Sequence, residues 1–280
     1  MSQIFAAVHD EQVAMPSQSN DGVVAIVRMA LTAVWIVGPV LGAWLGATFG
    51  LRPMLWVTAT CFLLQILPLG TLKGVGPPKT SPDGRSAPVT AGPSLSDMLP
   101  LLAFTGLFVL VYAGESIKYG FLLIYMQEQL HIEPAIRGAV IGIQPFIELC
   151  IMPFSVILGR RIGIIWLMCI AAGLGVIANI FFATSGSVFG MFAAQILMGG
   201  VWGIFMVLGI LVAQRLLLGA VATASAIFMS SSALSSALGG VAGGIGVATL
   251  GLPSVFFIPA ICSLLAVVGL AAMARRYKFH

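Results

Sequence analysis

Long stretches of this chain contain no charged residue, and this feature limits the folds that are open to it. Only 8% of the 280 residues are charged and 59% are hydrophobic, with a mean hydropathy of +1.08. A water-soluble domain carries about 25% charged residues. The composition therefore excludes a water-soluble enzyme and predicts an all-α polytopic membrane protein, because helices satisfy their own backbone in lipid.

Apolar segments long enough to cross a bilayer recur along the sequence. A transmembrane helix needs about 20 mostly apolar residues. Eight segments qualify, namely 23–49, 52–72, 98–126, 137–158, 162–184, 188–212, 219–248 and 252–274. Residues 73–97 are rich in Pro, Gly, Ser and Thr and predict a loose cytoplasmic linker. We therefore expect eight transmembrane helices.

The basic residues indicate the orientation of these segments. One group falls in alternate connections and the C-terminal tail: Lys73, Lys79, Arg85, Arg160, Arg161, Arg215, Arg275, Arg276 and Lys278. Only Arg52 and Arg137 fall in the opposite connections. Because cytoplasmic loops are enriched in Lys and Arg, both termini are expected in the cytoplasm. The net charge of +4 is then a sign of topology, and no nucleic-acid partner is expected.

The last two apolar segments repeat the first two. A shift of 201 residues gives 11 identities over the 27 positions 38–64, without a gap. Internal repeats of this kind are typical of secondary transporters. We therefore expect residues 98–280 to form a complete six-helix unit. Residues 1–72 would be the remnant of an earlier unit that lacks its first four helices.

Five short segments carry a resemblance to known transporters. The run WIVGPVLGAW, with Gly38, Pro39 and Gly42, resembles the Gly-Pro motif of facilitator exporters, although it lacks the further upstream glycines. The run LGRRIG, with Arg160 and Arg161, resembles a loop motif of the same superfamily but lacks its usual Asp. The segments MSQIFAAVHDE, IELCIMP and AAQILMGGVWGIF resemble the sugar efflux transporter family of the major facilitator superfamily.

This resemblance implies a fold and a function. The fold would be an N-terminally truncated major-facilitator fold, equivalent to helices 5–12 of 12. The function would be proton-coupled efflux of sugars or small glycosides by alternating access, in the inner membrane of a bacterium. Two alternatives stay open: a drug or metabolite proton antiporter, and a non-transporting remnant that needs a partner chain for the missing helices. No cofactor is implied.

Three ionisable residues lie well inside the predicted spans, and each is a candidate for function. An unpaired charge in the bilayer core costs about 3 kcal/mol or more. Because one lysine neutralises one carboxylate, Lys118 is expected to pair with Glu115 or Glu148. We expect Glu148 to be the coupling or substrate-binding acid. The alternative is a structural ion pair that fixes helix contacts.

Polar groups near these charges extend the candidate site. Tyr112 and Tyr119 share a helix face with Glu115 and Lys118, and Gln144 shares one with Glu148. The full set for substrate or proton binding is Glu148, Glu115, Lys118, Gln144, Gln195, Tyr112, Tyr119, Ser232 and Arg28. Arg28 has the alternative of reaching the cytoplasmic interface. Amides such as Gln195 suit sugar hydroxyls, but they also bond between helices.

Small residues form two further patterns. Ser225, Ser232 and Ser236 are spaced to form one polar stripe on a helix, which either faces a cavity or serves close packing. Glycines at GxxxG spacing are expected to pack helices together; they are the series Gly38, Gly42 and Gly46 and the pairs Gly239/Gly243 and Gly240/Gly244. Gly38, Pro39, Gly42, Arg160 and Arg161 are the candidates for packing and gating. Cysteine spacing and histidine positions indicate neither a metal site nor a catalytic one.

Overall fold

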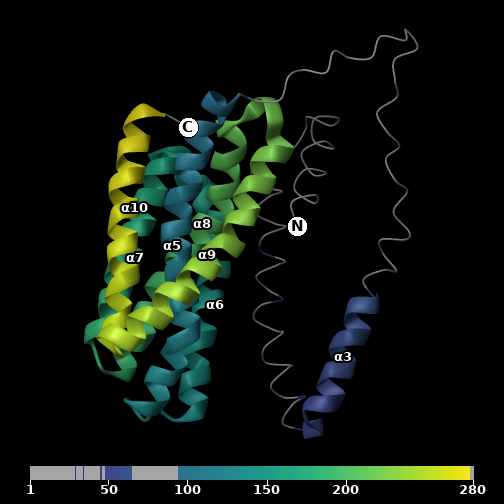
Figure 1. Ribbon diagram of the computed structural model, residues 1–280, viewed down its shortest axis with the longest axis vertical. Coiled ribbons are helices and arrows are strands. Elements are labelled where there is room, and N and C mark those ends of the chain that lie inside the picture. The colour runs from purple at the N-terminus through teal and green to yellow at the C-terminus, as the bar shows by residue number, and fades with distance from the viewer. Residues whose placement is uncertain (1–28, 30–33, 35–44, 46–47, 65–93, 278–280) are drawn as a thin grey trace. The chain divides into compact units, whose positions relative to one another are not determined.

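The structure, a computed structural model, describes residues 29, 34, 45, 48–64 and 94–277. Every element that it describes there is helical, and Figure 1 shows the long helices running side by side. They are α5 (Leu95–Glu128), α6 (Pro134–Ile162), α7 (Ile164–Thr184), α8 (Val188–Leu216), α9 (Val221–Leu250) and α10 (Phe257–Arg276). The 3-10 turns η1 (Leu218–Ala220) and η2 (Ser254–Phe256) precede α9 and α10. The helix α3 (Leu51–Leu64) belongs to a separate compact unit.

Six of the eight predicted spans correspond to helices that are long and apolar enough to cross a membrane. The class of all-α polytopic membrane protein is therefore confirmed, whereas the count of eight is not. The predicted span 52–72 is described only as far as residue 64, and the 14-residue α3 is about 21 Å long at 1.5 Å per residue. Most of the span 23–49 and of the linker 73–97 lies outside the described residues.

Local signals set the ends of the helices. Pro134 occupies the first turn of α6, where a missing N–H costs nothing. The Ser187 hydroxyl caps α8 by accepting a hydrogen bond of 3.1 Å from the Gly190 N–H. The last turn of α6 carries Arg160 and Arg161, whose charges favour the negative end of the helix dipole. These ends lie within a few residues of the predicted boundaries.

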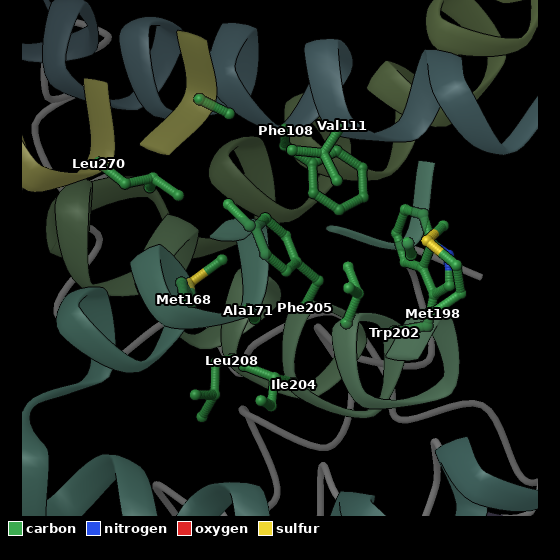
Figure 2. Packing of buried hydrophobic residues seen from close by; sticks show 14 of the residues in the cluster. Phe108, Val111, Met168, Ala171, Met198, Trp202, Ile204, Phe205, Leu208 and Leu270 are labelled. Atoms are coloured by element: carbon green, nitrogen blue, oxygen red, sulfur yellow. The ribbon is translucent and has the colours of Figure 1, made fainter. Parts of the chain in front are cut away.

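The central helix of the six-helix unit is α8, most of whose residues are buried. It packs against α6, α7 and α9, while α5 packs against α9 and α10, and α7 against α10. Figure 2 shows the resulting core, in which Phe108 and Val111 of α5 face Trp202 and Phe205 of α8. Although α5 and α6 follow one another in the chain, their backbones make few close contacts.

Glycines bring two pairs of helices into close contact. A Cβ added at Gly199 of α8 would lie 2.7 Å from the Cβ of Ile147, and one at Gly203 would lie 2.9 Å from that of Ile151. Real Cβ atoms do not approach so closely, so α8 packs on α6 at a distance that only glycine permits. Gly199 and Gly203 thus have the packing role that was predicted for other glycines of the chain.

The glycines of α9 divide into two faces. Gly239 and Gly243 lie against α5, where a Cβ at Gly243 would be 2.7 Å from the Phe121 ring. This confirms the predicted packing role of that pair. A Cβ at Gly240 or Gly244 would meet no atom of the described chain within 4 Å, so the second pair packs no helix of the described unit.

Candidate functional site

A buried ion pair lies in the middle of α5. The Lys118 Nζ donates to the Glu115 Oε1 at 2.7 Å, three residues apart on the same helix. Lys118 is fully buried and Glu115 is 6% exposed. Two charges at this depth are tolerated only because they neutralise each other. Of the two partners that the sequence left open for Lys118, the structure selects Glu115.

Gln144 of α6 joins this ion pair from the neighbouring helix. Its Oε1 accepts a short hydrogen bond from the Lys118 Nζ, and its Nε2 donates to the Glu115 Oε1 at 2.8 Å. The amide is 2% exposed, so both its polar atoms are used inside the protein. Gln144 therefore bridges α5 and α6 where their backbones do not pack closely.

Trp202 of α8 completes the cluster. Its indole Nε1–H donates to the Glu115 Oε2 at 2.7 Å, and the ring is 2% exposed. Sequence reasoning missed this residue as a site member. The available signal was chemical: an indole N–H inside a long apolar helix needs a partner, and carboxylates are scarce in these spans. We define the Glu115 cluster as Glu115, Lys118, Gln144 and Trp202.

Glu148 lies one helical turn beyond Gln144 on α6. It is half-buried, and its charge attracts that of Lys118 less strongly than the charge of Glu115 does. The structure therefore brings all three ionisable residues predicted for the spans into one region. Glu115 is held by Lys118 directly, and Glu148 is the carboxylate at the edge of the cluster.

The two predicted tyrosines differ in environment. Tyr112 packs edge-to-face on Trp202, with ring centroids 5.1 Å apart, and stacks on Phe108 at 5.6 Å. Tyr119 is 46% exposed, and the Lys118 Nζ lies 4.5 Å from the centre of its ring. Both rings therefore touch members of the Glu115 cluster, one through Trp202 and the other through Lys118.

Gln195 of α8 is fully buried, and neither its Nε2 nor its Oε1 has a hydrogen-bond partner within the part of the chain that the structure describes. It lies seven residues before Trp202, which places the two side chains within about 20° on the helix and about 10 Å apart along it. The amide thus shares the helix face that bears Trp202. Its donor and acceptor are both available to a polar ligand.

The serines of the predicted stripe on α9 differ in burial. Ser225 is buried and accepts a hydrogen bond of 3.0 Å from the Gln214 Nε2. Ser232 is half-buried and donates to the Met229 carbonyl at 2.8 Å, while Ser236 is exposed. The three serines differ in burial because neighbouring helices cover α9 unevenly along its length, and the role of the stripe, in a cavity or in packing, stays a prediction.

Two further candidates, Arg160 and Arg161, lie apart from the cluster. Arg160 and Arg161 are exposed at the end of α6, far along the helix from Gln144. Arg28, Gly38, Pro39 and Gly42 lie outside the described residues. Among the residues that the structure does describe, no group of three His, Cys, Asp or Glu side chains is arranged to hold a metal ion.

Comparison with known proteins gives one informative match. No protein-family model matches the chain. A protein of Deinococcus radiodurans named "Putative sugar efflux transporter" is 26% identical over 269 residues, which is 94% of this chain and 68% of that protein. The chain resembles a sugar efflux transporter. This confirms the resemblance seen in the motifs, and with the six apolar helices it supports an integral membrane transporter rather than an enzyme.

Proposed function

We propose that this protein is a proton-coupled secondary transporter that exports sugars or small glycosides by alternating access. The observation that carries the proposal is the Glu115 cluster, with Glu148 one turn beyond Gln144 on α6, in a chain whose sequence resembles a sugar efflux transporter. Ionisable groups are kept inside a membrane protein at a cost, and they commonly mark ion or substrate pathways.

The architecture that we propose follows the internal repeat. Residues 98–280 form one six-helix unit, residues 23–72 supply two helices of the other, and residues 73–97 connect them on the cytoplasmic side. The substrate path runs between units of this kind in transporters built from repeats. Both termini then face the cytoplasm of a bacterium, with the chain in its inner membrane. Its partners are the substrate, protons and the bilayer.

Glu148 is the proton carrier in this proposal. Lys118 donates to Glu115 and Gln144, and the charge of Glu148 attracts the same ammonium group more weakly than that of Glu115 does. A half-buried carboxylate whose surroundings change as the transporter opens and closes gains and releases a proton. Gln195 supplies the sugar contact, because its buried amide has a donor and an acceptor unused in the described chain.

The test is transport by the full chain in proteoliposomes with an imposed proton gradient. We expect labelled sugar to move against the proton flux, and a protonophore to stop it. Glu148→Gln should keep sugar exchange at equal pH on both sides and lose the response to the gradient. Glu128→Gln, an exposed carboxylate at the end of α5, is the matched control and should behave as the wild type.

Three outcomes would contradict the proposal. Transport of cationic dyes with no transport of sugars would indicate a drug antiporter. No transport of either class would indicate a chain that does not transport by itself. An unchanged gradient response in Glu148→Gln would remove this residue from the mechanism.

A further inference from the structure

The Glu115 carboxylate accepts hydrogen bonds from three helices. Its Oε1 receives Lys118 of α5 at 2.7 Å and Gln144 of α6 at 2.8 Å, and its Oε2 receives Trp202 of α8 at 2.7 Å. All the donors are buried. Hydrogen bonds to an ionised acceptor are short and about twice as strong as neutral ones. This arrangement suits a carboxylate and not a carboxylic acid, which would have to place its own proton among donors.

Trp202 is held rigidly in this position. Its ring packs edge-to-face on Tyr112, Phe108 and Phe205, with centroid distances of 5.1, 6.3 and 6.3 Å. Gly199 and Gly203 on either side of it in sequence let α8 lie directly on α6. Because the backbone and the ring are both fixed, the indole N–H cannot follow Glu115 if that carboxylate moves.

We propose that Trp202 is a positioning residue that keeps Glu115 ionised and bound to Lys118, and so leaves Glu148 as the carboxylate that carries the coupling proton. The effect on transport rests on the proposed function; the effect on Glu115 itself does not. In this scheme the two carboxylates have different tasks although they lie in the same region. Glu115 balances the buried lysine, and Glu148 responds to pH.

Among the residues that the structure describes, few charged or titratable groups lie around Glu115. On α5 they are Lys118, Tyr112 and Tyr119, and α6 contributes Glu148. The sequence of α9 contains no ionisable side chain, that of α8 has only Arg215 near its end, and α10 has Cys262 besides its terminal arginines. Replacing Trp202 therefore removes one hydrogen-bond donor from the Glu115 carboxylate without adding or removing a charge.

The experiment compares Trp202→Phe with wild type in liposomes, using infrared absorption of protonated carboxyl groups as the pH is lowered. Phe keeps an aromatic ring but has no N–H. Loss of a donor to the ionised form favours the protonated form, so the variant should show a protonated-carboxyl band at an acidic pH at which the wild type shows none. The new band must disappear in Trp202→Phe/Glu115→Gln. Trp166→Phe, at a 42% exposed indole of α7, is the matched control and should show no new band.

The pH dependence of transport is the second measurement. The pH profile of sugar efflux by Trp202→Phe should acquire a second titration on its acidic side, with a rate about tenfold lower there and a KM within about twofold of wild type. A purely structural role would lower the thermal stability and leave both the infrared titration and the pH profile unmoved, and that result would overturn the inference. An infrared shift in a chain that transports no sugar would support the role of Trp202 and refute the proposed function.

A third measurement covers the case in which Trp202→Phe fails to fold. Indole ¹⁵N–¹H signals of the wild-type protein should include one that exchanges slowly with water, because its N–H is buried against Glu115. Glu115→Gln should move that signal and leave the other four tryptophan signals in place. Equal shifts of all five signals, or no shift, would contradict the inference.

Discussion

Two helix junctions in the six-helix unit are built in opposite ways. Where α6 meets α8, the α8 positions in contact are glycines, which have no side chain, and they pack directly on backbone and aliphatic groups of α6. Where α6 meets α5, the backbones are further apart, and Gln144 reaches across to Lys118 and Glu115. The first junction depends on shape and the second on hydrogen bonds.

The difference indicates which junction can be remade during a transport cycle. Close packing at glycine contacts is lost by small displacements, because every atom pair at the surface separates together. Hydrogen bonds between side chains can exchange partners while the helices move, provided that each buried group finds a new partner. We therefore expect α6 and α8 to keep their contact through the cycle, and any exchange of hydrogen-bond partners to occur at Gln144.

Lys118→Met should have the largest effect, because it breaks the polar junction and leaves Glu115 as a buried charge with no counterion on its helix. We expect a loss of about 3 kcal/mol in the free energy of unfolding, measured by thermal denaturation in detergent micelles. The double variant Lys118→Met/Glu115→Gln removes both charges and should recover at least half of that loss. A single variant as stable as the wild type would show that the ion pair contributes nothing.

Gly199→Ala should break the glycine junction and cost about 2 kcal/mol, since the new Cβ would lie 2.8 Å from the Gln144 carbonyl oxygen of α6. The matched control is the adjacent Gly200→Ala, whose Cβ would make an ordinary contact of 3.6 Å with Leu174. Because alanine favours the helix, this control should be neutral or slightly stabilising. Equal effects of the two substitutions would contradict the proposed contact geometry. The free energy of unfolding of both variants is measured by the same thermal denaturation assay.

Gln195→Leu should separate stability from function on the α8 face that bears Trp202. Replacing a buried amide that has no partner in the described chain by an apolar group of similar size should stabilise the protein by about 1 kcal/mol. If the amide binds a sugar hydroxyl, the same variant should lose sugar efflux at least tenfold in the proteoliposome assay. A stabilised variant that transports normally would remove Gln195 from the substrate site.

Ser232→Ala should have the smallest effect, within about 0.5 kcal/mol in thermal denaturation. Its hydroxyl donates to the Met229 carbonyl of its own helix and contributes to neither junction. A loss of sugar efflux in this variant, without a loss of stability, would restore the serine stripe as part of a substrate path.

Much of the helical layout could be predicted from the amino-acid sequence. A span must be about 20 apolar residues long whatever it packs against, so 98–126 and 188–212 correspond closely to α5 and α8. The rarity of charge inside the spans likewise marked Glu115, Lys118 and Glu148 as a set. These predictions rest on local composition and on the cost of charge in lipid, and neither depends on which helices are neighbours.

Only the tertiary structure decided how these residues are paired. Trp202 lies 87 residues from Glu115, and Gln144 lies 26 residues from Lys118, so their contacts depend on the rotation and pairing of whole helices. The serines of α9 show the same dependence, since their regular spacing did not determine which neighbour covers each one. Uniformly apolar helices carry little periodicity that fixes their rotation; close contacts at glycines and a few buried hydrogen bonds set it instead.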